Sequence, residues 1–239
     1  MDSKAVTREI NSCIKPFLKK NRFNKWTSRT YWRYLSDRID IIDFQSFNSY
    51  NADVIGCTTF SFSINLSCFL RYIPSETKIK YKNTEPRPSE SQGHFRRRLK
   101  KGIIQTELET NDIWFIDNHG ANLIDVIIDC GNQIQKNGLS WFDKFATKEN
   151  VLDILINDSE DMDGTWGFGN FNSPLRNEYT AYTAIGLNKY ELAFDRLKAL
   201  SNYYIKEYEK QKYPYFIQRK KVIDNEIEKL RLTMTQKIL

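Results

Sequence analysis

The side chains best suited to ligand chemistry form a basic cluster near the middle of the chain, composed of Arg96, Arg97, Arg98, Lys100 and Lys101. An arginine can donate two parallel hydrogen bonds to one phosphate group, so this cluster is a candidate nucleic-acid-binding site. Residues 19–29 are also basic, and they contain Phe23 and Trp26, whose rings could stack on bases. We expect a short helix over residues 94–101, however, and three consecutive arginines on a helix point in different directions. The plainer interpretation is a solvated basic face.

Two carboxylates on an expected strand could hold a metal ion. Asp40 and Asp43 precede Gln45, and paired acidic side chains hold magnesium in many nucleases. The Glu-x-Lys partner that such a site needs on the next strand is missing, because Ser61 and Ser63 occupy the corresponding positions. We therefore interpret the carboxylates as residues that keep an edge strand soluble, and we predict no catalytic residue among them.

The two histidines, His94 and His119, could act as general bases beside Asp112 or Asp117. No serine or cysteine nucleophile motif accompanies them, and both lie in polar segments, so we predict surface histidines. The histidines and cysteines do not have the spacing of zinc ligands. The four cysteines fall at apolar positions that we expect to be buried: Cys13, Cys57, Cys68 and Cys130. We expect no metal ion and no cofactor, and we favour a non-enzymatic protein.

An acidic segment at residues 158–164, Asp-Ser-Glu-Asp-Met-Asp-Gly, is similar in composition to a calcium-binding loop. In such a loop, carboxylates occupy alternate positions and a bidentate glutamate occupies position twelve. With Ser159 at position one, Gly164 occupies position six and Asn170 occupies position twelve. Asn170 lacks both the charge and the bidentate geometry of a glutamate, which argues against calcium. We interpret the segment as an acidic surface linker.

The composition is that of a folded protein. Hydrophobic residues make up 40% of the 239 residues, with 15 Phe, 13 Tyr and 5 Trp, which is sufficient for a core. The net charge of +6 is confined to the first half, because residues 1–120 hold 20 Lys/Arg against 13 Asp/Glu and residues 121–239 hold 16 against 17. No apolar run approaches the roughly 20 residues of a membrane helix. The N-terminus has no signal-peptide pattern, so we expect a cytoplasmic location and no membrane contact.

The elements that would position these side chains follow an α+β order. After an opening helix that contains Pro16, strands are predicted at residues 30–35, 39–47, 60–70 and 112–117, and loops at residues 48–52 and 74–93. In the third strand, apolar residues alternate with polar ones, which is typical of a strand with one buried and one solvated face. The predicted fold is α+β, with an antiparallel sheet of about four strands covered by helices and an all-helical C-terminal extension.

The second half of the chain is expected to be helical. Helices are predicted at residues 122–138, ended by Gly138, and then at residues 147–156, 178–186, 189–208 and 216–237. A polar break at residues 157–174 divides the chain into an α+β domain, 1–156, and a helical domain, 175–239. The last helix carries an apolar stripe composed of Ile223, Ile227, Leu230 and Met234. We predict that this stripe binds a partner or a second copy, or packs on its own domain.

Several short motifs occur in a fixed order: residues 14–20, 22–23, 31–33, 41–46, 60–66, 85–86, 96–99, 112–116 and 141–145. Over about residues 5–156 this order resembles the bacterial family described as domain of unknown function 4304. The resemblance implies a shared fold and a bacterial origin, and it supplies no catalytic residues. The helical pair near residues 187–199 is similar to a single tetratricopeptide hairpin, with Tyr190, Ala193 and Leu197 at its packing positions.

These observations predict a non-enzymatic protein that binds another bacterial protein or itself. We picture an accessory or immunity-type subunit of a bacterial toxin or phage-defence system. The basis is the resemblance to a family without an activity, the lack of a catalytic set of residues, and the long amphipathic final helix. The alternative is a nucleic-acid-binding protein that uses its basic N-terminal half.

Overall fold

The computed structural model describes residues 1–157 and 173–236. The chain forms two compact units, Met1–Lys144 and Phe145–Leu239. The predicted calcium-like segment, residues 158–164, lies outside the described residues. Helix α6, Lys148–Asn157, belongs to the second unit, whereas we had predicted a helix there as part of the first domain. None of the described helices combines the length and apolarity needed to cross a membrane.

A five-stranded antiparallel sheet forms the centre of the first unit, in the order β1-β2-β3-β4-β7. Its strands are β1 Lys25–Trp26, β2 Thr30–Tyr34, β3 Arg38–Ser46, β4 Phe62–Leu70 and β7 Phe95–Arg98. The first three predicted strands and the α+β class are confirmed. The fourth is wrong, because Trp114 forms only an isolated bridge with Phe62 and β7 takes the place beside β4.

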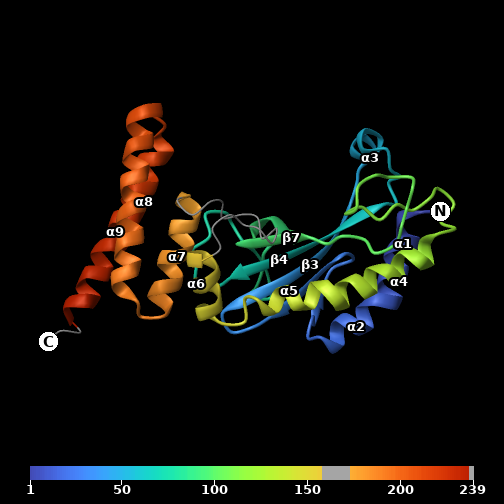
Figure 1. The fold of residues 1–239 in the computed structure, drawn as a ribbon, viewed down its shortest axis with the longest axis horizontal. Helices are drawn as coiled ribbons and strands as arrows, with labels where there is room; N and C mark the ends of the chain where they lie inside the picture. The colour runs from blue at the N-terminus through green and yellow to red at the C-terminus, as the bar shows by residue number, and fades with distance from the viewer. Residues whose placement is uncertain (158–172, 237–239) are drawn as a thin grey trace. The chain divides into compact units, whose positions relative to one another are not determined.

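Helices cover one face of the sheet (Figure 1). They are α1 Ser3–Glu9, α2 Lys15–Lys20, α4 Leu123–Gln133 and α5 Leu139–Asp143. A series of edge-to-face aromatic contacts fills this side, since ring centroids lie 6.0 Å apart for Tyr31 and Phe44 and 5.7 Å apart for Phe44 and Phe62. Trp114 stacks on Phe62 at 6.2 Å and extends the series. Such contacts add to the free energy of apolar burial.

Two of the covering helices contain a π-helical turn. Residues Ile10–Ile14 form one such turn directly before Pro16, which has no N–H to complete the α-helical ladder. Residues Ile134–Gly138 form the other between α4 and α5. The predicted stop at Gly138 is therefore wrong, because the buried Gly138 is enclosed by Leu66 and Leu99 and the helix continues past it.

The opposite face of the sheet is also buried, against our expectation of a solvated one. Every residue of β4 is buried, including Ser63, Asn65 and Ser67. A Cβ atom on Gly93 would lie 1.6 Å from the Ser67 hydroxyl, so the chain packs directly on the strand there. A small apolar cluster of Trp32, Ile39, Ile41 and Phe69, with Ile79 against it, secures this covering segment.

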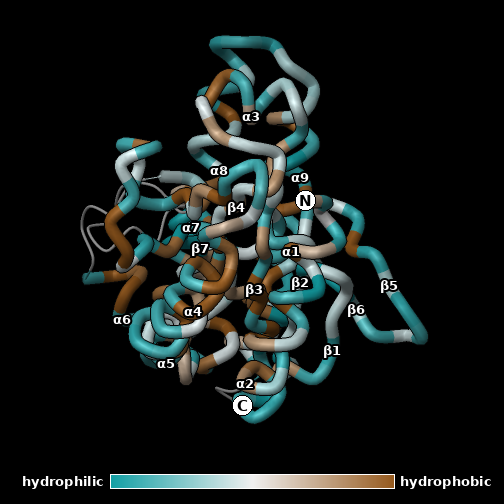
Figure 2. The backbone as a smooth tube through the Cα atoms, turned by 90° about the vertical axis from the view of Figure 1, so that its right-hand side faces the viewer, coloured by the Kyte–Doolittle hydropathy of each residue, from teal (hydrophilic) through white to brown (hydrophobic). Residues whose placement is uncertain are grey.

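The covering segment contains a β-hairpin that we had predicted as a loop. Its strands are β5 Lys80–Lys82 and β6 Glu85–Arg87, followed by the short helix η2 Glu90–Gln92. Asn83 and Thr84 join the strands with φ angles of 50° and 65°, as a type I′ turn requires. Figure 2 shows this hairpin, hereafter the arm, projecting from the unit with hydrophilic residues along β5. The other predicted loop is also wrong, because Ser49–Ile55 forms helix α3, capped by Asn48.

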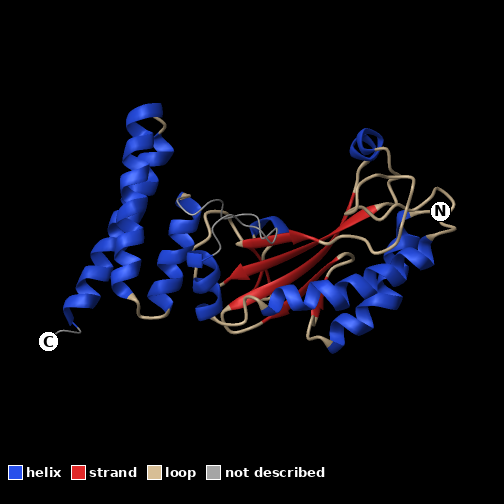
Figure 3. Ribbon diagram, in the orientation of Figure 1, coloured by secondary structure: helices blue, strands red, loops and turns tan. Residues whose placement is uncertain are grey.

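The second unit is helical in its described part (Figure 3). Its helices are α6 Lys148–Asn157, α7 Pro174–Gly186, α8 Tyr190–Gln211 and α9 Pro214–Gln236. Helices α7, α8 and α9 share one core, built from Ala181, Ala184, Ala193, Leu197, Leu200, Tyr204, Ile223, Ile227 and Leu230. Three members of the predicted partner-binding stripe thus pack inside the unit, and Met234 lies against the same core.

A candidate anion-binding groove

The predicted basic cluster is divided between two faces of a strand. Because β7 replaces the expected helix, Arg96 and Arg98 point to one side and Arg97 to the other. The guanidinium of Arg96 lies 2.8 Å from the Glu90 carboxylate, and that of Arg98 lies 3.1 Å from Asp112. Lys100 is exposed. The Nζ atom of Lys101 is buried, and desolvation lowers its pKa. These five side chains therefore do not form one phosphate-binding surface.

The aromatic residues predicted to stack on bases have other contacts. Phe23 is fully buried, and its ring lies under the guanidinium of Arg33 at 4.9 Å. The ring of Trp26 contacts the ammonium groups of Lys15 and Lys19, at 4.1 and 4.8 Å. Phe23 is thus a core residue, and Trp26 forms cation–π contacts within its own unit.

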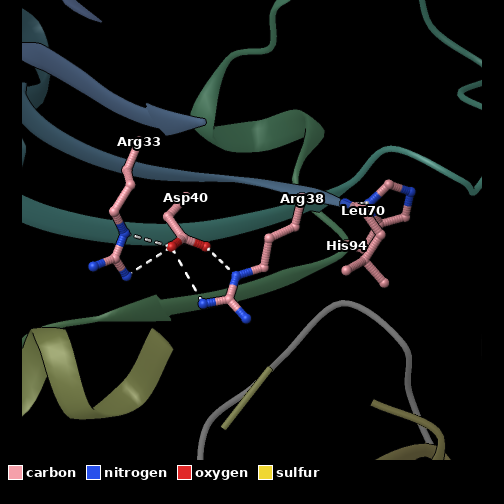
Figure 4. Close-up of polar contacts among 5 residues, drawn as sticks. All are labelled: Arg33, Arg38, Asp40, Leu70 and His94. Atoms are coloured by element: carbon pink, nitrogen blue, oxygen red, sulfur yellow. Dashed lines mark hydrogen bonds and ion pairs between the residues drawn. The ribbon is translucent and has the colours of Figure 1, made fainter. Parts of the chain in front are cut away.

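Asp40 is the centre of a buried ion-pair network, shown in Figure 4. Its carboxylate accepts hydrogen bonds from Nε of Arg33 at 2.8 Å and from Nε of Arg38 at 2.9 Å. Asp40 itself is fully buried. The strand that carries it, β3, is central in the sheet, so the predicted role in edge solubility is wrong. A buried carboxylate between two arginines neutralises charge inside the fold.

His94 has a structural role as well. Its Nδ1 atom accepts a hydrogen bond from the backbone N–H of Leu70 at 2.9 Å (Figure 4). Its ring packs on Phe69 with the centroids 5.0 Å apart. Burial lowers the pKa of His94 to about 3, so the ring is neutral at neutral pH. The predicted surface position is wrong for His94, whereas His119 is exposed.

The four cysteines differ in burial, and all four are free thiols. Cys68 and Cys130 are buried, and burial raises the pKa of both thiols. Cys57 is half-buried and Cys13 is exposed, in contrast to the expected burial of all four. Among residues 1–157 and 173–236, no group of three or more His, Cys, Asp or Glu side chains is placed to hold a metal ion.

The side chains that the structure does bring together line a groove between the arm and the sheet. The cavity has a volume of about 960 Å³. Its floor is formed by Thr30, Asp43 and Gln45, which lie on neighbouring strands β2 and β3. Its wall is formed by the arm and the segment that follows, with Lys78, Lys80, Tyr81, Lys82, Arg87 and Glu90. Hereafter, the groove refers to this cavity.

Hydrogen bonds to the sheet hold the base of the arm in place. The indole N–H of Trp32 donates to the carbonyl of Pro88 at 2.9 Å, and the Tyr34 hydroxyl donates to that of Pro86 at 2.8 Å. The guanidinium of Arg87 lies over the Trp32 ring at 5.1 Å. Lys25 adds an ion pair to Glu85 at 2.7 Å. The wall of the groove is therefore preorganised at its base.

The cations of the groove lack acidic partners in the described part of the chain. Lys78, Lys80, Lys82 and Arg87 form no ion pair with a described residue, whereas Glu90 pairs with Arg96. The Nε atom of Arg87 is buried and has no hydrogen-bond partner there. A buried donor without an acceptor costs about 1–3 kcal/mol. An anion in the groove would supply that acceptor and would neutralise the lysines.

Sequence reasoning missed the groove because residues 74–93 are rich in proline, serine and charge. One signal was available. Lysine alternates with Ile79 and Tyr81, which is the two-residue period of a β-strand. Asn83 and Thr84 follow as a candidate hairpin turn. The turn has Asn-Thr in place of the more usual Asn-Gly, and this obscured it.

Residues 14–144 match the family described as "Domain of unknown function (DUF4304)". The match covers more than half of the chain and nearly all of the first unit. No curated protein and no solved structure matches the chain.

Proposed function

The chain belongs to the DUF4304 family, whose description names no activity, and we propose from the groove that the protein binds single-stranded nucleic acid. The observation that carries the proposal is the set of four cations, Lys78, Lys80, Lys82 and Arg87, that line one cavity without acidic partners among the described residues. Phosphate groups of a nucleic-acid backbone are the ligands that such a set binds best.

The distribution of charge supports a polyanionic ligand for the first unit. Residues 1–144 hold 22 Lys/Arg against 16 Asp/Glu, and residues 145–239 hold 14 against 14. The whole net charge of +6 thus belongs to the unit that contains the groove. Excess positive charge around a cleft raises the local concentration of anions and their rate of association.

The position of the cations favours a single strand over a duplex. A two-stranded β-ribbon can enter the major groove of DNA, but it then needs its cations on the side that faces the duplex. Here the lysines line the cavity between arm and sheet. Tyr81 also lines the cavity and is 67% exposed, and an exposed tyrosine ring can stack on an unpaired base.

The proposal is for binding rather than catalysis. The residues that line the groove include neither histidine nor cysteine, and Asp43 and Glu90 are its only acids among the lining residues. One of the three grounds for the protein-interaction hypothesis was the stripe of the last helix, and three of its four residues are core residues of the second unit. A role as an accessory or immunity-type subunit stays a prediction.

Fluorescence anisotropy with labelled single strands of mixed sequence tests the proposal. We expect binding to the full chain that weakens as salt rises, with a slope of log K against log salt of about −0.7 for each phosphate neutralised. Lys80→Glu combined with Lys82→Glu should weaken binding by roughly tenfold or more, because two contacts become repulsive. The matched control reverses two exposed lysines of the second unit, Lys210→Glu with Lys221→Glu.

The control distinguishes a site from general attraction. Equal losses in both double variants would show that only the net charge matters, and no binding at low salt would overturn the proposal. A polyglutamate peptide of similar charge serves as a competitor. If it displaced the oligonucleotide at equal charge concentration, the ligand would be an acidic protein segment instead.

A further inference from the structure

The floor of the groove carries hydrogen-bonding groups that do not serve phosphate. Asp43 and Gln45 are two residues apart on β3, so their side chains lie on the same face. Both line the groove opposite the cations of the arm. Within the unit, Asp43 is attracted by Arg29 and accepts a hydrogen bond from Thr30. A carboxylate repels phosphate, so its further capacity as an acceptor suits the edge of an unpaired base instead.

The acceptor on the floor is Asp43. Its Oδ1 atom accepts a hydrogen bond from the Thr30 hydroxyl at 2.7 Å, and Oδ2 has no donor among the described residues. Burial raises the pKa of Asp43 against the opposing effect of the Thr30 hydrogen bond. One carboxylate oxygen thus remains to accept a hydrogen bond from a ligand.

The donor on the floor is the amide of Gln45, and its orientation is determined by a relay of side chains. Arg98 can only donate, and its Nε donates to Oδ1 of Asn65 at 3.2 Å. Asn65 must therefore present its amide nitrogen to Gln45, whose Oε1 accepts at 2.8 Å. The NH₂ group of Gln45, a residue that lines the groove, thus remains as a donor. The ion pair between Arg98 and Asp112 anchors the relay at 3.1 Å.

We propose, on the basis of the proposed function, that Asp43 and Gln45 select amino bases, cytosine and adenine, over keto bases. Cytosine and adenine each present an exocyclic NH₂ donor beside a ring-nitrogen acceptor, which matches a carboxylate next to an amide donor. Thymine and uracil present the reverse pattern, a carbonyl beside a ring N–H. A keto oxygen would then face the carboxylate and the ring N–H would face the Gln45 amide.

In this scheme Arg98 is a positioning residue, although we had predicted it as a phosphate ligand. It acts through Asn65 on Gln45 and does not contact the ligand itself. The cations of the arm supply binding that is independent of sequence, and the floor supplies the discrimination between bases.

A pair of homopolymers separates the two contributions, because cytosine and thymine are similar in size and differ in the pattern of their hydrogen-bonding edge. Strands of about eight nucleotides match the length that one small domain covers. At neutral pH we expect the full chain to bind the deoxycytidine strand at least fivefold more tightly than the deoxythymidine strand, as a matched two-hydrogen-bond contact provides.

Asp43→Asn should abolish this preference, because the amide can also present a donor to the thymine carbonyl. The matched control is Asp53→Asn, which removes the same charge from the exposed face of α3 and should leave the preference unchanged. If neither strand binds, the proposed function fails. If both strands bind equally to the natural chain, or if the preference persists in Asp43→Asn, the base-selection inference is overturned and the groove remains a phosphate site.

Discussion

The two units differ in how their cationic side chains are paired with acidic ones. In the second unit, residues 145–239 hold 14 cationic and 14 acidic side chains, and four of the five cations in α9 pair with nearby acids. The pairs are Arg219 with Glu178, Lys220 with Asp224, Lys229 with Glu226, and Arg231 with Glu228. In the first unit, the four cations of the groove have no acidic partner among the described residues.

Secondary structure explains part of this difference. Side chains three or four residues apart meet on the surface of a helix, so a helical unit can neutralise its charges locally. The arm is a short hairpin in which Lys80 and Lys82 lie on the same side, and like charges on one side repel each other. The comparison supports the proposed assignment of ligand binding to the first unit, whereas the second unit is neutral and uses its apolar stripe for its own core.

The largest expected effect concerns the buried ion-pair network around Asp40 in the first unit. Asp40→Ala would leave Arg33 and Arg38 without their carboxylate in a buried site. Breaking a buried pair by removing one partner costs about 3–5 kcal/mol of unfolding free energy. Urea unfolding followed by tryptophan fluorescence measures it, because Trp26, Trp32, Trp114 and Trp141 all lie in the first unit.

An exposed pair of the second unit provides the control for this prediction. Glu228→Ala breaks its contact with Arg231, in which both side chains are more than half exposed. Measured by far-ultraviolet circular dichroism, which reports on the helices of the second unit, the change should be below about 1 kcal/mol. If Asp40→Ala does not fold, Asp40→Asn keeps the side-chain shape and one of the two acceptor oxygens, and it should give an intermediate loss. A change below 1 kcal/mol for Asp40→Ala would show that the network contributes little.

The arrangement of the sheet was predictable from sequence only where the period of a strand was clear. The alternation from Phe60 to Leu70 located β4, and the aromatic and β-branched residues before it located β2 and β3. The burial of Ser67 was not predictable, because it depends on Gly93, a distant residue that packs on the strand. Polar residues on one face indicate solvent only when no other segment covers that face.

The groove illustrates a second limit. Its cations and its floor come from segments more than thirty residues apart, such as Asp43 and Lys80, and their proximity follows from tertiary contacts. The division of Arg96, Arg97 and Arg98 between two faces of β7 was not predictable for a related reason. The directions of three consecutive arginine side chains depend on whether the chain there forms a helix or a strand. Their availability to a ligand also depends on whether acids such as Glu90 lie opposite them.

The next prediction tests whether the stripe of the second unit serves its core. Ile223→Ala removes a fully buried side chain from α9, and such truncations cost about 2–5 kcal/mol. Val222→Ala, at the adjacent position, removes a side chain that is 45% exposed and should change stability by no more than about 0.5 kcal/mol. Far-ultraviolet circular dichroism during urea unfolding measures both. Equal, small effects would show that the stripe is not a core element and would restore its role in partner binding.

The smallest expected effect is a pH dependence of the unfolding free energy that distinguishes the two units, because both histidines of the chain lie in the first unit. Burial lowers the pKa of His94 to about 3 in the folded state, against an ordinary value of 6.5. Below pH 6.5 the unfolded chain therefore binds a proton that the folded chain excludes. The stability contribution of neutral His94 is complete above pH 6.5 and is lost as the pH falls from 6.5 towards 3.

Between pH 7 and pH 5 this loss amounts to about 2 kcal/mol. The tryptophan-detected unfolding midpoint should fall over that interval, and His94→Gln, which cannot gain a proton there, should reduce the fall. Exposed His119 offers the matched variant, because His119→Gln removes a histidine that folding does not bury. Its pH dependence should follow that of the natural chain. If both variants behaved alike, the pH dependence of the first unit would arise from its carboxylates, and the buried imidazole would not distinguish the two units.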